Sequence, residues 1–197
     1  MTMQNTGFMS QTHLKKYATK HINLIGGPGS FKSVFAAAML VNIKLSLKSA
    51  EFVPEFAKSL VWQKKYEVLK NQYYIAQQQH KMLKLLDGDL QYLITDGSLP
   101  QLLFYNLHTE DNICDKQKTQ DQILAWYNEF DNINIFIERN PKLPYEQVGR
   151  FQSEEEAKLI DIKMENTLKE LNIPYTKVMA DLMKINQFTN HVILQET

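Results

Sequence analysis

Residues 26–33 have the composition and order of a phosphate-binding loop. They read Gly-Gly-Pro-Gly-Ser-Phe-Lys-Ser and match the pattern G-x-x-x-x-G-K-[ST], except that Phe31 replaces the last glycine of the pattern. Glycines allow successive backbone N–H groups to turn toward phosphate oxygens, and the helix that follows such a loop adds its positive N-terminal end. The residues expected to bind a nucleotide through this loop are Gly26, Gly27, Pro28, Gly29, Ser30, Phe31, Lys32, Ser33 and Val34.

Lys32 and Ser33 are the residues of this loop with direct chemical roles. The Lys32 side chain is long enough to reach the β- and γ-phosphates of ATP, and the Ser33 hydroxyl is a ligand for Mg²⁺. Phe31 leaves two alternatives open. Its side chain points away from the phosphates if the backbone there is close to helical rather than left-handed, or the loop is degenerate and binds nucleotide weakly or not at all.

Carboxylates stand at the ends of two expected strands. Asp96 closes the buried run 92–96, and ligands of parallel sheets bind at the carboxyl ends of strands, so Asp96 is a candidate for holding Mg²⁺. Glu51 and Glu55 bracket the end of another strand, close to the expected acceptor. We favour Glu55 as the group that orients or deprotonates an acceptor hydroxyl, because Pro54 fixes the turn before it. The alternative is that Glu51 is a solvated edge residue and that Glu55 only stabilises the start of a helix.

The chain has 22 Lys and Arg residues, and its two arginines lie close together. Arg139 and Arg150 flank a Pro-containing stretch that follows an expected strand and precedes an expected helix. A planar guanidinium can bind two phosphate oxygens at once, which a lysine ammonium cannot. We therefore predict a lid over 139–153 that brings both arginines over the transferred phosphoryl group and excludes water. The alternative is a surface loop with two solvated charges.

A stretch rich in glutamine and tyrosine lies in the helical pattern over 64–86. Amide side chains beside aromatic rings can read the edge and the face of a base. The apolar stripe of this helix is typical of core packing, and we favour the core for most of its aromatic residues. The residues with these two alternatives are Gln72, Tyr73, Tyr74, Gln77, Gln78 and Gln79.

Strand and helix patterns alternate along the chain, which implies right-handed crossovers and a largely parallel sheet. Strands are predicted near residues 21–26, 50–53, 90–96, 133–138, 175–179 and 191–194. Helices are predicted near 32–48, 55–86 with a break near Trp62, 98–107, 120–130 and 154–171, the last with a capping box of Ser153 and Glu156. The predicted organisation is an N-terminal arm over 1–20, with a short polar helix or arm at 11–20, and a single domain over 21–197.

Composition excludes several classes of protein. A net charge of zero argues against a protein that coats nucleic acid or a membrane surface. The single cysteine, Cys114, cannot form an internal disulfide, so a reducing cytoplasm is the expected compartment. The chain has neither an apolar run of about 18 residues nor a basic segment followed by an apolar one at its start, so no membrane helix and no signal peptide are predicted.

Several segments occur in an order that resembles one group of proteins. They are the loop at 26–33, the run Glu51-Phe-Val-Pro-Glu-Phe-Ala-Lys-Ser-Leu-Val-Trp62, the strand ending at Asp96, and Tyr145-Glu-Gln-Val-Gly-Arg150 followed by 153–157. Over residues 20–180 the chain resembles the phage-encoded P-loop ATPases and kinases related to nucleotide kinases, an AAA-type ATPase group. The resemblance implies an α/β P-loop NTPase fold with a five-stranded parallel sheet between helices, the nucleotide on the loop, and an Arg-containing lid.

The same resemblance suggests roles for residues outside the loop. Deoxynucleoside kinases also have a glutamate after the second strand and a lid with arginine, which makes Glu55 and Arg150 comparable here. Phe31 departs from the usual glycine of this group. Some related phage kinases phosphorylate hydroxymethylated bases already in DNA, so the acceptor class stays open, and a phage origin implies the host cytoplasm.

The function predicted from these features is that of an ATP- and Mg²⁺-dependent phosphotransferase acting on a nucleotide or nucleoside. Its catalytic residues are expected to be Lys32, Glu55, Asp96, Arg139 and Arg150, with Ser33 and Asp96 at the metal. The alternatives are a kinase of a modified DNA base and a regulatory protein that binds ATP or hydrolyses it slowly. A lysine-lined groove favours the DNA kinase, and a closed small pocket opposes it. The expected partners are ATP, one of these acceptors and a second copy of the chain, but no membrane.

Overall fold

A parallel β-sheet forms the centre of the computed structural model, which describes residues 15–148 and 152–194. The sheet has five strands in the order β2-β3-β1-β4-β5, and every neighbouring pair is parallel. The strands are β1 (Lys20–Ile25), β2 (Ala50–Val53), β3 (Tyr92–Thr95), β4 (Asp131–Glu138) and β5 (Thr176–Met179). This confirms the predicted fold class, because parallel neighbours need the helical crossovers that the alternating pattern indicated.

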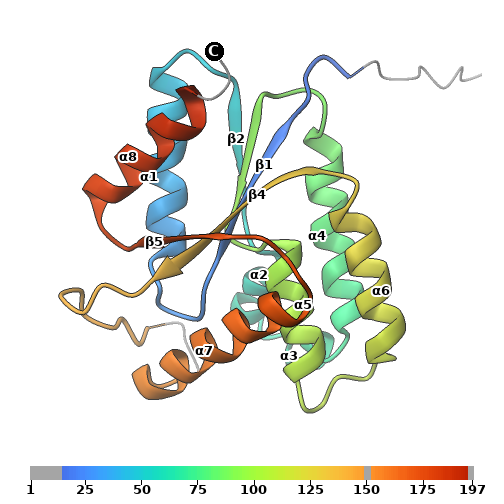
Figure 1. Ribbon diagram of the computed structural model, residues 1–197. Helices are drawn as coiled ribbons and strands as arrows, with labels where there is room; N and C mark the ends of the chain where they lie inside the picture. Colours follow the sequence, from blue (N-terminus) through green and yellow to red (C-terminus); the bar gives the residue numbers. More distant parts are fainter. Residues whose placement is uncertain (1–14, 149–151, 195–197) are drawn as a thin grey trace, which may run out of the picture.

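Helices cover both faces of the sheet (Figure 1). They are α1 (Lys32–Leu45), α2 (Phe56–Trp62), α3 (Tyr66–Leu69), α4 (Gln72–Leu86), α5 (Leu99–His108), α6 (Lys116–Tyr127), α7 (Glu154–Glu170) and α8 (Leu182–Leu194). Helices α1 and α8 pack together on one face, and α4, α5 and α6 lie on the other. Helix α7 packs on α5 below the sheet edge at which the strands end.

Two apolar clusters join the sheet to its helices. Ile22 and Leu24 of β1 pack with Phe35 of α1 and Ile185 of α8 in one cluster. Helices α4 to α7 contribute the other cluster, which includes Leu103 of α5. Strand β3 is buried along its whole length and β1 along all but its first residue, as expected for central strands of a parallel sheet. The loops at the strand ends are therefore held on a rigid base.

Polar side chains begin several of the helices that border the site. Ser98 accepts a hydrogen bond from the backbone N–H of Gln101 and so starts α5 directly after β3. Ser153 and Glu156 exchange hydrogen bonds with each other's backbone N–H, which confirms the predicted capping box at the start of α7. Helix α6 begins at Lys116, earlier than predicted, because Asp115 caps it through the Lys118 N–H.

The predicted strand over 191–194 is wrong, because these residues form the last turn of α8. Asp181 accepts hydrogen bonds from the backbone N–H groups of Met183 at 2.8 Å and Lys184 at 3.2 Å, which starts this helix. Ile185 and Val192 are buried at helical spacing against α1. A short apolar run at the end of an amphipathic helix has the same local pattern as a short strand.

Two other predicted boundaries have different outcomes. The expected break near Trp62 is confirmed, since α2 ends there and Lys64 has a left-handed backbone with φ 57°. Residues 1–14 of the predicted arm lie outside the described residues. Its described part, 15–19, contains no helix, and β1 begins at Lys20.

Candidate active site

The glycine-rich loop lies at the carboxyl end of β1 and leads directly into α1, as predicted. Gly26 and Gly29 have positive φ angles of 157° and 73°. A Cβ atom at Gly29 would lie 2.5 Å from the ring of Tyr145, so glycine is needed there for both conformation and space. The loop therefore has the curled backbone that the glycine-rich pattern predicts.

Phe31 adopts φ 66° and ψ 19°, so its backbone is left-handed and the alternative with a nearly helical backbone at this position is wrong. The loop needs a left-handed residue where the pattern has its last glycine, and Phe31 takes that conformation despite its Cβ atom. Its ring is half-buried, packs against the cluster under α1 and also borders the cavity described below. The turn is thus retained with a bulky side chain in it.

The Lys32 ammonium lies inside the loop. Its Nζ atom donates hydrogen bonds to the carbonyl oxygens of Gly26 at 2.6 Å and Gly27 at 3.0 Å. Burial lowers the pKa of Lys32, and the nearby carboxylates of Glu55 and Asp96 act in the opposite direction. The ammonium therefore lies beside the backbone carbonyls of the first two loop residues.

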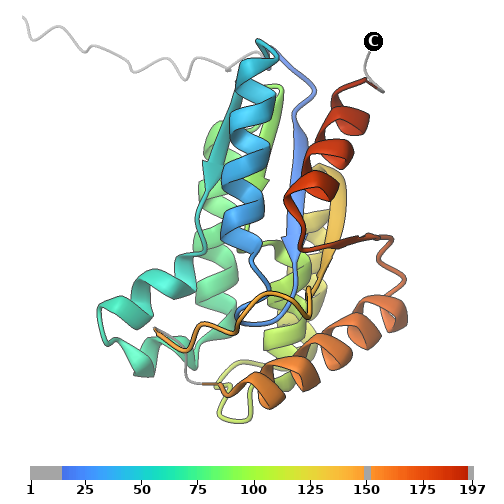
Figure 2. The same cartoon turned by 90° about the vertical axis from the view of Figure 1, so that its left-hand side faces the viewer.

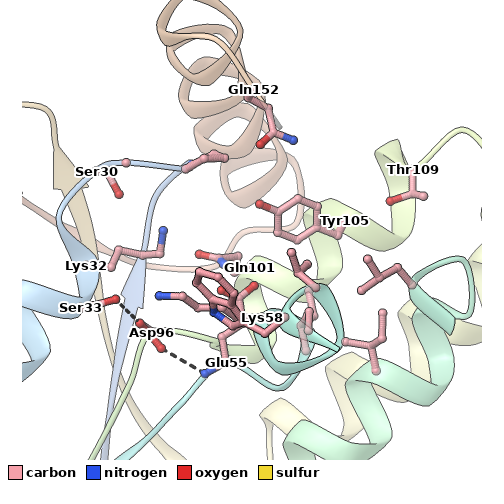
Figure 3. A pocket seen from close by; sticks show the side chains of 18 of the residues that line it. Ser30, Lys32, Ser33, Glu55, Lys58, Asp96, Gln101, Tyr105, Thr109 and Gln152 are labelled. Atoms are coloured by element: carbon pink, nitrogen blue, oxygen red, sulfur yellow. Dashed lines mark hydrogen bonds between the residues drawn. The ribbon is translucent and has the colours of Figure 1, made fainter. Parts of the chain in front are cut away.

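Asp96 connects the loop to the start of α2 (Figure 3). The Ser33 hydroxyl donates to Asp96 Oδ2 at 2.6 Å, and the backbone N–H of Glu55 donates to Asp96 Oδ1 at 3.1 Å. A hydroxyl and a carboxylate that meet in this way are the hard oxygen ligands that Mg²⁺ prefers. The described residues contain no cluster of three or more His, Cys, Asp or Glu side chains suited to a metal. This fits Mg²⁺, which is commonly held by one or two protein groups together with phosphate oxygens and water.

The backbone on both sides of Glu55 is fixed by hydrogen bonds to one side chain. The buried amide of Gln79 accepts a hydrogen bond from the Phe56 N–H at 2.8 Å and donates to the Pro54 carbonyl at 3.1 Å. Burial raises the pKa of the Glu55 carboxyl, and the charge of Asp96 raises it further. The cations that oppose this shift in the Glu55 pKa are Lys32 and Lys58. Glu55 borders the cavity described below, and Figure 3 shows it joined to Asp96 by a hydrogen bond.

Glu51, the other candidate at the end of β2, has a different position. It is exposed and pairs with Lys44 of α1 at 3.7 Å on the surface. It therefore has the solvated position of the alternative interpretation, away from the loop.

Arg139 lies at the end of β4 and braces the underside of the loop. Its guanidinium forms an ion pair with Asp161 of α7 and donates to the Pro28 carbonyl at 2.6 Å. Asp161 also accepts a hydrogen bond from the Gly27 N–H at 2.6 Å. Arg139 does not border the cavity in the described part of the chain. Arg150 lies outside the described residues, so its predicted role stays a prediction.

The described part of the predicted lid crosses the phosphate-binding loop, which Figure 2 shows as the segment after β4 running in front of the loop. The Tyr145 ring lies against Gly29, and its hydroxyl donates to the Gln152 carbonyl at 2.8 Å. Glu146, Val148 and Gln152 border the cavity from this side. The segment after β4 thus covers the loop.

A cavity of about 770 Å³ lies between the loop and the helices on the other side of the carboxyl edge. Lys32, Ser33, Glu55 and Asp96 all border it, so the structure brings these four predicted residues together. Helix α5 and the segment from α2 to α4 form the opposite wall. Figure 3 shows side chains from both walls directed into this space.

Several polar residues of the cavity wall were not predicted from the sequence, and three of them lie on α2 and α5. They are Lys58 of α2 and Gln101 and Tyr105 of α5. Burial raises the pKa of the Tyr105 phenol, and the charges of Glu55 and Asp161 raise it further. One signal could have identified the α5 residues: with Thr109 they follow at four-residue spacing on one helix face soon after Asp96.

The glutamine- and tyrosine-rich stretch contributes only one of its six candidate residues to the cavity wall, as far as the described residues extend. Gln72 is buried there and donates to the Leu69 carbonyl at 2.7 Å. Gln79 has the structural role described above. Tyr73 and Tyr74 are exposed and do not border the cavity. The stretch is thus neither mainly core nor mainly a binding surface.

Comparison with known proteins identifies the fold and the family. A family model described as an AAA domain matches residues 21–184. A search of curated proteins finds no match. In the described residues, the helices are all too short or too polar to cross a membrane.

Solved structures of several kinases resemble the chain at low sequence identity. Deoxyadenosine kinase from M. mycoides, with the products dCMP and dCDP bound, has a TM-score of 0.53 and 18% identity, over 89% of this chain and 97% of that chain. Thymidylate kinase from Candida albicans has a TM-score of 0.53 and 14% identity, over 91% and 92% of the two chains. A NadR protein in complex with NAD and AMP-PNP has a TM-score of 0.62 and 12% identity, over 89% of this chain and 49% of that chain. These likenesses establish the P-loop nucleotide-kinase fold.

Proposed function

This chain belongs to the AAA-domain family, and from that premise we propose that it is an ATP- and Mg²⁺-dependent kinase whose acceptor is a nucleoside or nucleotide. The observation that supports this most directly is the convergence of Lys32, the Ser33–Asp96 pair and Glu55 on one cavity. A cation for the phosphates, oxygen ligands for a metal and a carboxyl with a raised pKa are the groups that phosphoryl transfer requires.

Each residue has a separate part in the proposed transfer. The acceptor hydroxyl oxygen forms a bond to the γ-phosphorus while the bond from that phosphorus to the bridging oxygen breaks, leaving ADP. Glu55 orients the hydroxyl and accepts its proton. Lys32 and the loop N–H groups stabilise the negative charge on the phosphate oxygens. Ser33 and Asp96 would hold Mg²⁺, which when bound neutralises charge on the phosphates.

The contacts of Arg139 change the role that we propose for it. Its guanidinium is bound by Asp161 and by the Pro28 carbonyl, so we assign it to holding the loop in shape rather than to contacting the transferred group. Arg150 keeps the proposed lid role, as a guanidinium that closes over the phosphates.

The left-handed backbone of Phe31 favours a second candidate, an ATP-binding regulator or slow ATPase without an acceptor. A bulky residue in this conformation carries a cost of about 1–3 kcal/mol, and its ring borders the cavity beside the phosphates. The raised pKa of Glu55 on the opposite wall favours the kinase, because a regulator has no use for a proton acceptor there.

A transfer assay separates the two candidates. ATP labelled at the γ-phosphate is incubated with nucleosides, nucleoside monophosphates or DNA containing hydroxymethylated bases, and labelled products are separated by chromatography. If the protein is a kinase, a labelled acceptor should form. The amount of this product should drop to zero with Lys32→Ala and fall strongly with Glu55→Gln. Labelled inorganic phosphate alone, at the same rate with and without acceptors, would identify the slow ATPase instead.

A further inference from the structure

The side chain of Gln101 lies in the wall of the cavity with an unused hydrogen-bond acceptor. Gln101 is 1% exposed, and its Oε1 atom has no hydrogen-bond partner among the described residues. Ser98 fixes the first turn of α5 through the Gln101 N–H, so the side chain projects from a firmly started helix. Figure 3 shows Gln101 directed into the cavity beside Glu55 and Lys58.

An acceptor atom in this position is unusual in a folded protein. Most buried polar atoms have a partner, and an unpaired one is destabilising. The other buried side-chain atoms without a partner in the described residues are His21 Nδ1 and Ser30 Oγ. His21 does not border the cavity and Ser30 belongs to the phosphate-binding loop, so Gln101 Oε1 is the unpaired acceptor on the wall opposite the loop. A ligand N–H or O–H group could donate the hydrogen bond that Gln101 Oε1 lacks.

The charges of this wall disfavour a phosphorylated acceptor. Its cations are Lys58 and Lys70, and the Lys70 ammonium is paired with Glu67 at 2.9 Å and Asp111 at 3.6 Å. The carboxylates of this wall are Glu55 and Asp111, and Glu146 borders the cavity from the segment after β4. Among the described residues, no arginine lines this half of the cavity, although guanidinium groups are the preferred partners of phosphate. The wall therefore suits an uncharged molecule.

Aromatic and apolar side chains extend the wall outward. Trp62 is 67% exposed and Tyr66 is 46% exposed, and both border the cavity on the side of α2 and α3. The apolar side chains beside them are Leu69, Ile75 and Leu102. A planar ring can pack against such rings and apolar groups without a charged partner.

We propose that Gln101 determines acceptor specificity, and that the acceptor is an uncharged molecule with a planar ring and an N–H or O–H group that donates to Gln101 Oε1. This inference rests on the proposed kinase function and narrows it from nucleoside or nucleotide to nucleoside. In the bound arrangement the ring packs toward Tyr66 and Leu69, and the hydroxyl to be phosphorylated faces Glu55. A nucleotide is disfavoured because its phosphate would meet the carboxylates Glu55 and Asp111 on a wall where the described residues supply no guanidinium.

Direct binding measurements test this inference without relying on turnover. Calorimetry with adenosine, guanosine, cytidine, uridine and their 2′-deoxy counterparts is compared with the matching 5′-monophosphates and with a short hydroxymethylated oligonucleotide. At least one nucleoside should bind wild-type protein about tenfold or more tightly than its monophosphate. Tighter binding of the monophosphate or the oligonucleotide, or no binding of any nucleoside, would overturn the inference.

The Gln101→Met variant tests the residue itself. It keeps the approximate volume but removes the whole amide, the acceptor oxygen together with its NH2 group, so affinity for the bound nucleoside should fall about tenfold or more while ATP affinity is kept. The melting temperature should not fall, because the Gln101 side chain forms no hydrogen bond among the described residues that the variant could lose. Gln117→Met, on the exposed face of α6, is the matched control and should bind like wild type.

The two levels of proposal can fail separately. If nucleoside binding depends on Gln101 but no phosphoryl transfer occurs, the proposed kinase function is wrong and the proposed nucleoside site is supported. If Gln101→Met transfers phosphate to nucleosides with an unchanged acceptor KM and an unchanged preference among nucleosides, the kinase function is supported. The proposed role of Gln101 in acceptor specificity is then wrong. If the Gln101→Met melt shows unfolding, the wild-type comparison of nucleoside with monophosphate still decides the charge preference.

Discussion

The guanidinium of Arg139 and the carboxylate of Asp161 form an ion pair beneath the phosphate-binding loop, with side chains only 17% and 15% exposed. Each partner also binds the loop backbone: Arg139 donates to the Pro28 carbonyl, and Asp161 accepts from the Gly27 N–H. A Cβ atom at Gly27 would lie 2.5 Å from Asp161 Oδ1, so the contact requires glycine. The pair fixes the end of β4 and the first half of α7 to the loop.

We predict that Asp161→Asn destabilises the protein by about 1–3 kcal/mol, because it leaves the Arg139 charge in a partly buried site without its partner. ATP affinity should fall with it, since the Gly27 backbone loses its strongest acceptor. Urea unfolding and nucleotide binding measure the two effects. Lys158→Met, which breaks an exposed pair with Glu154 on the same helix, is the control and should change stability by less than about 0.5 kcal/mol. Equal stability of the two variants would contradict this account.

Lys32→Ala should abolish phosphoryl transfer and weaken ATP binding while the fold remains intact. The Lys32 ammonium is the only lysine charge within the loop, and its own bonds are to loop carbonyls that solvent or neighbouring groups can satisfy. Nucleotide affinity beside a thermal melt is the measurement, with Lys44→Ala at the other end of α1 as control. Unchanged ATP affinity in a normally folded variant would exclude the loop as the ATP site.

Substitutions of Phe31 separate backbone strain from packing. Phe31→Gly relieves the left-handed backbone but loses a half-buried ring, so we expect a net stability change within about 1 kcal/mol. Phe31→Ala loses the ring and keeps the strain, and should be about 1 kcal/mol less stable than Phe31→Gly. Chemical denaturation measures both. A tenfold gain in ATP affinity in Phe31→Gly would instead indicate that the ring obstructs the phosphates.

The raised pKa of Glu55 gives a pH dependence of activity with a definite sign. A proton acceptor works only when ionised, so kcat/KM should fall on the acid side at a pH above the ordinary glutamate value of 4.5. The Lys58 charge favours the ionised form, and Lys58→Met should therefore shift this acid limb to higher pH. Profiles of kcat/KM against pH for wild type and Lys58→Met are the measurement. A shift to lower pH would contradict the assigned electrostatics.

The same pKa shift predicts an effect on stability. A carboxyl whose pKa is higher in the folded than in the unfolded protein binds its proton more tightly when folded, so its ionisation destabilises the fold as pH rises through that interval. Glu55→Gln should therefore be more stable than wild type at pH 7, and the difference should shrink as the pH falls to about 4. Denaturation curves at both pH values test this, and a variant that is less stable at pH 7 would oppose it.

Arg150→Lys should reduce turnover by about 100-fold or more, because the ammonium keeps the charge and loses the two-pronged contact with phosphate. ATP affinity should change far less, since in the proposed mechanism the loop binds phosphate through its own amides and Lys32 rather than through the lid. Steady-state kinetics and nucleotide binding provide the comparison, with Arg139→Lys measured beside it. For Arg139→Lys we expect mainly lower stability. Near-wild-type turnover in Arg150→Lys would contradict the proposed role of Arg150 in the lid.

Local patterns were sufficient to predict the sheet and one wall of the site. The loop motif and the positions of Asp96 and Glu55 at strand ends indicated the groups that meet in the cavity, because parallel topology brings strand ends to one edge. The 191–194 segment was predicted wrongly because four apolar residues do not distinguish a strand from the end of a helix.

Other features depend on contacts between distant segments. The pairing of Arg139 with Asp161 joins residues 22 positions apart. The unpaired oxygen of Gln101 could not be predicted, because the local sequence does not indicate whether a glutamine on a helix is buried. Its burial follows only from the packing of the surrounding helices. Phe31 shows a third limit: propensity argues against a left-handed phenylalanine, yet the loop geometry requires it.

The two oxygens of Asp96 give the active site a property that neither neighbouring residue has alone. One oxygen accepts from the Ser33 hydroxyl, on the side proposed for ATP, and the other accepts from the Glu55 N–H, on the side proposed for the acceptor. A ligand that repositions this carboxylate on one side changes the free energy of binding on the other. By thermodynamic linkage the effect is reciprocal: the factor by which ATP changes acceptor affinity equals the factor by which the acceptor changes ATP affinity. In the proposed kinase, donor and acceptor binding would therefore be coupled through a single side chain.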